Sequence, residues 1–357
     1  MSVVRPFRAR VVRQTYAEKT VTQMLDALPA AERPSRDEHR DPLPIDPAAY
    51  DESPMALFAY RLRRGDEQHV GVVGEVRADA FLDGRVRGHE AVQPERVDAL
   101  VDLYTSGAVR SELVALLHRP GPEFTAAMAE TLGSQPLIQF TGPDAWEQTV
   151  WRVSAAMTEQ LTEELGRRVH YIADGHHRVA ASVAVWKRDG QPSTSGVMCV
   201  MYPLDGLRLL SFHRRLSGPV RADELLALVF ETFEVREIDP LDEATGSFGL
   251  YVDGRWHDAT YKGARPPGAA GLDLAILNDR VLEPIARATN GGSRVEIASA
   301  HSSREELTKA CDQDGGAFFA LRPPTLDQLT DVADRGEVMP PKTTYFDPKP
   351  YAGIFLR

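Results

Sequence analysis

The sequence predicts a mixed α/β fold, and three observations support this class. An apolar strand pattern at 169–173 leads directly into Asp174-Gly175, and a helical pattern follows at 177–186. Runs rich in β-branched residues at 56–62 and 69–77 are separated by turn residues, as in paired strands. Patterns with helical spacing at 95–106 and 123–132 stand between these two regions. Strands that alternate with helices in this way are typical of sheets covered by helices.

Further elements follow from the same reasoning, taken in chain order. We expect a long loop at 20–55, because prolines and charged residues are frequent there. The additional expected elements are a helix at 146–165, strands at 196–202 and 207–212, a helix at 222–232, a hairpin of 249–251 with 255–261, and a helix at 272–282. Because the character of the chain changes after His213-Arg-Arg215, we expect two domains, residues 1–215 and 216–357.

Composition restricts the classes of function. The chain has 357 residues and a net charge of −11, which argues against a broad nucleic-acid interface, since that needs a surplus of Lys and Arg. No apolar run approaches the roughly 20 residues that cross a bilayer, and the charged N-terminus does not resemble a signal peptide. We therefore expect a cytoplasmic protein without a membrane partner. The two cysteines, Cys199 and Cys311, are expected to be structural thiols. A homodimer is compatible with the sequence.

The segment Tyr171-Ile-Ala-Asp-Gly-His-His-Arg178 is the strongest candidate for a binding site. Gly175 allows a positive φ and a close approach of a ligand to the backbone. The first N–H groups of the following helix, from His176 onward, have no partner within the helix and attract anions. Arg178 adds a guanidinium that binds phosphate oxygens in a bidentate manner. Asp174 either caps the helix or holds Mg²⁺ over the phosphates.

This segment has two other interpretations. The first is a well-capped helix with ordinary solvent-facing histidines. The second is a zinc site at His176 and His177, but adjacent helical residues point about 100° apart and do not readily share one ion. The combination of Asp-Gly with His-His-Arg favours an anion site.

A second candidate is Gly84-Arg-Val-Arg-Gly-His-Glu90, a short polar turn ahead of the helix expected near residue 94. A carboxylate in this place can accept a hydroxyl proton as a general base. From spacing alone, a surface acid in a loop is an equally good interpretation of Glu90.

The ordered motifs resemble the domain-of-unknown-function 1015 family. The shared features are His89-Glu90, Ala173 to Arg178, a strand ending in His213-Arg214, and Met339-Pro-Pro-Lys-Thr-Thr-Tyr-Phe-Asp-Pro-Lys349. Arg5-Pro-Phe-Arg8 is similar to the opening of that family. These motifs extend over nearly the whole chain.

The Asp-Gly-His-His-Arg core is also similar to a motif of free serine kinases, which have a ParB/sulfiredoxin-like nucleotide-binding fold. This resemblance implies phosphoryl transfer from ATP or ADP, with Mg²⁺, to a free hydroxy amino acid such as L-serine. It implies Glu90 as base, Asp174 as a catalytic and magnesium-binding residue, and Gly175 with His176, His177 and Arg178 at the nucleotide. His89 and Arg214 are then expected at the substrate, where Arg214 is a candidate partner for the carboxylate.

Two departures and one rival function follow from the resemblance. Sulfiredoxins have a catalytic Cys where His176 stands, so reduction of sulfinic acids is not expected. The family's Pro-Pro-Tyr-Asp-Val segment is replaced by the Pro-rich stretch at 33–47, which leaves open another acceptor or loss of activity. The rival function is a non-catalytic nucleotide-binding switch of the ParB-like type. We also expect the 339–349 segment to fold back on the first domain, where Lys342 or Lys349 would add positive charge near the phosphates.

Overall fold

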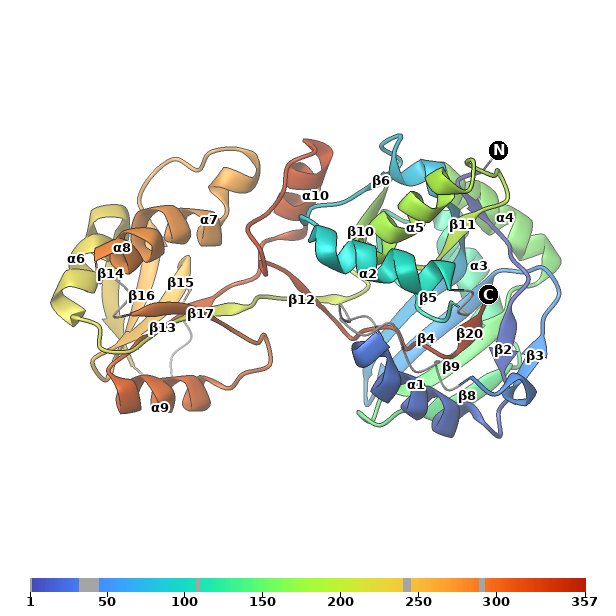
Figure 1. Cartoon of the computed structure of the whole chain (residues 1–357), viewed down its shortest axis with the longest axis horizontal. Helices are drawn as coiled ribbons and strands as arrows, with labels where there is room; N and C mark the ends of the chain where they lie inside the picture. Colours follow the sequence, from blue (N-terminus) through green and yellow to red (C-terminus); the bar gives the residue numbers. More distant parts are fainter. Residues whose placement is uncertain (1, 32–44, 107–109, 240–244, 289–292) are drawn as a thin grey trace. The chain divides into compact units, whose positions relative to one another are not determined.

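The computed structural model describes residues 2–31, 45–106, 110–239, 245–288 and 293–357. The chain forms two compact units, shown in sequence colours in Figure 1. Unit 1 comprises Met1–Arg208 and Pro348–Arg357, and unit 2 comprises Leu209–Asp347. The chain passes from unit 1 to unit 2 between residues 208 and 209. The domain boundary expected from the sequence was after residue 215. The functional division expected there, a nucleotide-binding part and an extension, stays a prediction.

A nine-stranded mixed sheet forms the centre of unit 1. Its strands are β1 (Val4–Arg5), β4 (Phe58–Arg64), β5 (Glu67–Arg77), β6 (Val86–Arg87), β7 (Val114–His118), β8 (Ile138–Thr141), β9 (Glu147–Arg152), β10 (His170–Asp174) and β11 (Gly196–Pro203). They follow the order β6-β10-β7-β11-β5-β4-β9-β8, and β1 pairs with β5. β10 is parallel to β6, which pairs with its first residues His170 and Tyr171, and antiparallel to β7, which continues to Asp174 at its carboxyl end.

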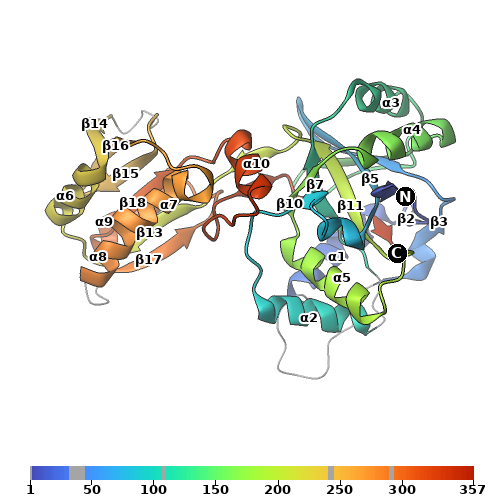
Figure 2. The same ribbon diagram turned by 90° about the horizontal axis from the view of Figure 1, so that it is seen from above.

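Helices pack in two pairs against this sheet. α2 (Pro94–Thr105) packs against α5 (His176–Arg188), and α3 (Pro122–Leu132) packs against α4 (Ala155–Gly166), as Figure 2 shows. The apolar side of α5 enters the core through Val179 and Val183, because these residues are one helical turn apart. The N-terminus of α5 is thereby held at the carboxyl end of β10.

A small three-stranded sheet joins both ends of the chain in unit 1. It consists of β2 (Arg10–Val12), β3 (Tyr50–Glu52) and β20 (Phe355–Leu356) in the order β20-β2-β3. The remaining elements of unit 1 are α1 (Ala17–Ala31) and the short helical turns η1 (Pro47–Ala49) and η2 (Ala78–Phe81).

Unit 2 has its own antiparallel sheet and its own core. Its strands are β13 (His213–Ser217), β14 (Phe233–Ile238), β15 (Phe248–Val252), β16 (Arg255–Tyr261), β17 (Arg294–Ala298) and β18 (Ala317–Leu321), in the order β14-β16-β15-β18-β13-β17. Its helical elements are α6 (Ala222–Thr232), η3 (Gly268–Gly271), α7 (Asp273–Leu277), η4 (Asn278–Leu282), α8 (Glu283–Ala288), α9 (Arg304–Asp314) and α10 (Leu326–Asp334). Two short strands, β12 (Arg208–Leu210) and β19 (Tyr345–Asp347), form a separate pair.

The mixed α/β class predicted from the sequence is confirmed, and so is the hairpin of β15 and β16. The finer ParB/sulfiredoxin-like label stays a prediction. Within the described ranges, no helix is both long and apolar enough to cross a membrane.

The helix expected at 146–165 is wrong in its first part. Residues Glu147–Arg152 are strand β9, paired on both sides by β4 and β8. Helix α4 begins only at Ala155, where the Ser154 side chain caps it by accepting the N–H of Met157. Two neighbouring strands satisfy the backbone of β9, and this outweighs the helical spacing of its apolar residues.

The long loop expected at 20–55 is also wrong at both ends, since β3 occupies Tyr50–Glu52. Helix α1 continues to Ala31, and it fully buries Val21 and Met24. Residues 32–44, which include most of the Pro-rich stretch, lie outside the described part of the chain. The expected helix at 272–282 is divided, since α7 passes into a π-helical turn at Asn278.

Candidate functional site

The expected change from strand to helix at Asp174 is confirmed. Strand β10 ends at Asp174, Gly175 is the N-cap, and α5 begins at His176. Gly175 has φ +104°, and a Cβ atom there would lie 3.2 Å from Nε of Arg178 and 3.2 Å from Cγ2 of Val114. Both the backbone conformation and the close packing therefore require glycine. The first turn of α5 directs its backbone N–H groups out of the helix end, a geometry that binds anions.

The carboxylate of Asp174 joins two cations at this turn. Its Oδ2 accepts a hydrogen bond from the Arg178 guanidinium, and its Oδ1 accepts one from Nζ of Lys349. Burial alone would raise the pKa of the Asp174 carboxyl, but Lys349 and Arg178 beside it hold the pKa well below its usual range. Asp174 is therefore ionised at physiological pH. The alternative that it caps α5 is wrong, because Gly175 is the N-cap and the two Asp174 oxygens accept from Arg178 and Lys349.

Magnesium does not fit Asp174 in this arrangement. Mg²⁺ is usually held by one or two carboxylates together with substrate phosphates. Each oxygen of Asp174 already accepts from a cationic side chain, so the ion would compete with Lys349 and Arg178 for the same atoms. Among the described residues there is also no cluster of three or more His, Cys, Asp and Glu side chains suited to a metal.

Glu90 lies beside the first residue of α5. Its Oε2 is 3.4 Å from Nδ1 of His176, and its side chain is 35% exposed. The backbone N–H of His89 donates to Nε2 of His176 over 3.3 Å. Because Nε2 accepts, the proton of a neutral His176 ring is on Nδ1, which faces the Glu90 carboxylate. The two motifs that the sequence analysis treated separately are thus in contact.

His89 forms the buried side of this group. Its ring stands edge-on to the His176 ring, with centroids 4.8 Å apart. Burial, assisted by the adjacent His176, lowers the pKa of His89 to about 3, so the ring is neutral at physiological pH. Gly88 packs against the His176 ring, where a Cβ atom would lie 3.1 Å from Cδ2 of His176. Gly88 lies in the polar turn 84–90, but no role was expected for it, although its place directly before His89-Glu90 was a usable signal.

His177 has a different neighbour from His176. Its Nε2 accepts the backbone N–H of Gln93 over 2.9 Å, and Gln93 is the N-cap of α2. This contact helps to hold α2 against α5. The expected position of His177 at a nucleotide stays a prediction.

Arg214 belongs to unit 2, on β13. Its guanidinium is buried and donates to the carbonyl oxygens of Pro341 at 2.8 Å and Lys342 at 3.2 Å. Burial lowers the pKa of Arg214 to about 10. These contacts hold the start of the terminal motif within unit 2, and the expected role of Arg214 at a substrate carboxylate stays a prediction.

The terminal motif is divided between the units. Its residues up to Asp347 belong to unit 2, whereas Pro348 and Lys349 belong to unit 1. Lys349, one of the two lysines expected near the phosphates, belongs to unit 1 and reaches the turn at Asp174.

These residues combine two chemical capabilities. The helix end, Arg178 and Lys349 concentrate positive charge around one carboxylate, in a chain whose net charge is −11. Glu90 supplies a carboxylate at the opening residue of the same helix. An anion-binding helix end and a proton acceptor beside it are two of the parts that phosphoryl transfer to a hydroxyl group uses.

Comparison with known proteins identifies a family and distant structural relatives. The family described as "Protein of unknown function (DUF1015)" matches residues 49–278. A mutant free serine kinase in complex with AMP has 17% identity and a TM-score of 0.39, with 77% of this chain and 86% of that chain covered. SbnI with a C-terminal truncation, from Staphylococcus aureus, has 10% identity and a TM-score of 0.40, covering 78% and 85%.

A conserved hypothetical protein from Pyrococcus furiosus has 16% identity and a TM-score of 0.36, covering 80% of this chain and 93% of that chain. Structural similarity at these values does not assign an activity to this chain. No match is found among curated proteins.

Proposed function

The chain belongs to the DUF1015 family, and we propose that it is a nucleotide-dependent kinase that phosphorylates a hydroxyl group of a free amino acid such as L-serine. One observation carries the proposal. Glu90 lies 3.4 Å from His176, the first residue of the helix that presents the anion site. The candidate base and the candidate phosphate site, predicted from separate motifs, therefore form one group.

The phosphates of ATP or ADP are proposed to bind at the N-terminus of α5. Backbone N–H groups of the first turn and the guanidinium of Arg178 would contact them. Arg178 is held by Asp174 and by the carbonyl oxygen of Leu113, so its orientation is set before a ligand arrives. A Mg²⁺ ion that accompanies the nucleotide would neutralise phosphate charge from the side of the phosphates.

The hydroxyl of the acceptor is proposed to lie at Glu90. As the hydroxyl oxygen bonds to the terminal phosphorus, the bond from that phosphorus to the bridging oxygen of the nucleotide breaks, and the hydroxyl proton passes to Glu90. The nucleotide leaves with one phosphate fewer. His176 directs a ring N–H at Glu90 and so orients the carboxylate, while the neutral His89 ring supports His176 from the buried side.

Two substitutions separate binding from turnover. Arg178→Ala should weaken nucleotide binding about 10- to 150-fold, since a charge-assisted contact to phosphate contributes about 1.5–3 kcal/mol. Glu90→Gln should bind nucleotide normally and lose turnover by about 10²–10⁴-fold, because a base acts only when the proton moves. Binding is measured by calorimetry, and turnover by ³¹P NMR of the phosphorylated product with a panel of hydroxy amino acids.

Matched controls are available in the same helices. Arg188→Ala removes an exposed arginine from the last turn of α5, and Glu95→Gln removes an acid from the first turn of α2. Both should leave binding and turnover unchanged. Wild-type turnover by Glu90→Gln would exclude Glu90 from the reaction. Tight nucleotide binding without turnover of any acceptor would instead favour the regulatory switch.

A further inference from the structure

The last ten residues, Pro348–Arg357, are fixed in unit 1 by their backbone. β20 pairs with β2, which lies close to the N-terminus of the chain. The N–H of Tyr351 donates to the Tyr60 hydroxyl at 3.2 Å, and the carbonyl of Gly353 accepts from the Tyr50 hydroxyl at 2.8 Å. This segment is therefore an integral part of the unit, although it returns from the far end of the sequence.

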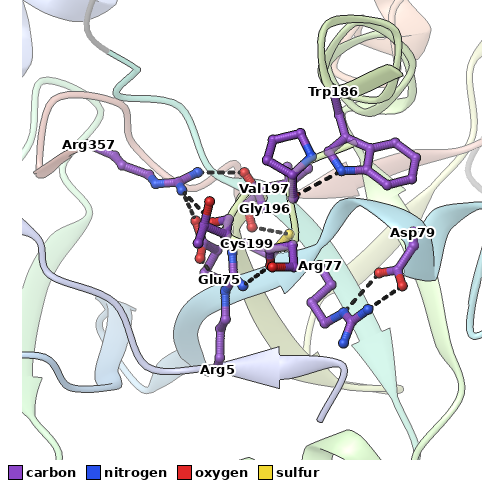
Figure 3. Close-up of polar contacts among 12 residues, drawn as sticks. Arg5, Glu75, Arg77, Asp79, Trp186, Gly196, Val197, Cys199 and Arg357 are labelled. Atoms are coloured by element: carbon purple, nitrogen blue, oxygen red, sulfur yellow. Dashed lines mark hydrogen bonds and ion pairs between the residues drawn. The ribbon is translucent and has the colours of Figure 1, made fainter. Parts of the chain in front are cut away.

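Side chains fix the same segment on two sides. Phe355 is fully buried, and its ring packs against Phe7 and Phe58 with centroids 6.5 and 5.3 Å away. The Arg357 guanidinium pairs with the buried carboxylate of Glu75, which also pairs with Arg5, as Figure 3 shows. The segment is anchored well beyond Lys349, so the backbone position of Lys349 does not depend on the ion pair of its ammonium group with Asp174.

Lys349 lies two residues before the anchored Tyr351, and its ammonium group reaches Asp174. The lysine side chain is 38% exposed and the Asp174 side chain 25% exposed, so a ligand can approach both. Buried groups already anchor the segment, so anchoring gives little reason for a lysine here.

Two cationic groups meet at the carboxylate of Asp174. Lys349 donates to its Oδ1 and Arg178 donates to its Oδ2. Holding both cations in place lowers the entropy that they lose when they bind an anion. A phosphate group has enough acceptor oxygens to be shared between them while Asp174 retains its own contacts.

We infer that Lys349 is a second phosphate-binding cation of this site, supplied by the C-terminal segment, and that Asp174 is the residue that positions Lys349 and Arg178. This inference rests on the proposed function. It assigns a role to the Pro348-Lys349 end of the terminal motif. If Lys349 binds phosphate, its loss should weaken the binding of ATP and ADP but not that of adenosine.

The test compares ligands that differ only in their phosphates. In Lys349→Met, which keeps the aliphatic stem, the affinity for ATP and ADP should fall about 10-fold, while that for adenosine stays unchanged. Lys349→Arg should restore most of the loss. Lys342→Met is the matched control, because Lys342 belongs to the same motif and its Nζ lies over the Phe212 ring. Affinities are measured by calorimetry, and melting temperatures verify folding.

Asp174→Asn provides the second arm. If Asp174 positions the cations, this substitution should also weaken ADP binding. In the Asp174→Asn background, Lys349→Met should then lower the affinity for ADP by a smaller factor than it does in the wild type. An unchanged ratio of adenosine to ADP affinity in folded Lys349→Met, with Arg178→Ala still impaired, would overturn the inference and leave the proposed function standing. Absence of nucleotide binding by the wild type would refute both.

Discussion

Replacing Gly175 with alanine tests whether the turn between β10 and α5 requires glycine. The residue has φ +104°, a region that costs a residue with a Cβ atom about 1–2 kcal/mol. The new Cβ would lie 3.2 Å from Cγ2 of Val114, a buried residue of β7 that has little room to move. It would also lie 3.2 Å from Nε of Arg178.

Together these effects should lower the free energy of unfolding of unit 1 by about 2–3 kcal/mol. Displacement of Arg178 should in addition weaken nucleotide binding. The matched control is Gly84→Ala, because Gly84 has φ +83° but a Cβ atom there would meet no other atom within 4 Å. It should show only the conformational cost of about 1–2 kcal/mol and normal binding.

Urea unfolding followed by tryptophan fluorescence measures this difference. Trp146, Trp151 and Trp186 belong to unit 1, so the signal reports chiefly on the unit that carries the substitution. Equal midpoint shifts for the two variants would refute the argument from close packing. Normal nucleotide affinity in Gly175→Ala would refute the argument that the methyl group displaces Arg178.

Two further predictions concern stability. His118 and His170 are buried with ring centroids 5.6 Å apart, and burial lowers the pKa of His118 to about 3 and that of His170 to about 4. Below pH about 6.5 the unfolded chain takes up protons that the folded chain does not, so stability should fall as the pH drops from about 6.5 towards 4. His118→Phe should flatten this dependence of the urea midpoint, and an unchanged slope would contradict it. Phe355→Ala should cost about 3–5 kcal/mol because a core ring is lost, whereas Phe230→Ala, at a side chain 49% exposed, should cost far less; similar melting temperatures for the two would show that β20 is not an anchor.

Local signals were sufficient for the turn that carries the candidate site. The apolar run before Asp174, the Gly at 175 and the helical spacing after it each act over a few residues, and the structure has the same succession. The predictions were wrong where contacts with segments distant in the sequence determine the secondary structure. β9 has apolar residues at helical spacing, but it lies between two strands that complete its hydrogen bonds. In the region of α1, frequent prolines and charged residues led to the prediction of a loop, although Val21 and Met24 form a buried apolar side of the helix.

The sequence by itself determined the mixed α/β class, the strand–glycine–helix turn and the identity of the residues able to bind phosphate or accept a proton. Only the tertiary structure decided which of these residues meet. Glu90 reaches His176 because β6 pairs with β10. Lys349 reaches Asp174 across 175 positions of the chain because β20 pairs with β2. Such contacts depend on which strands become neighbours in a sheet, and no local pattern of residues encodes that choice.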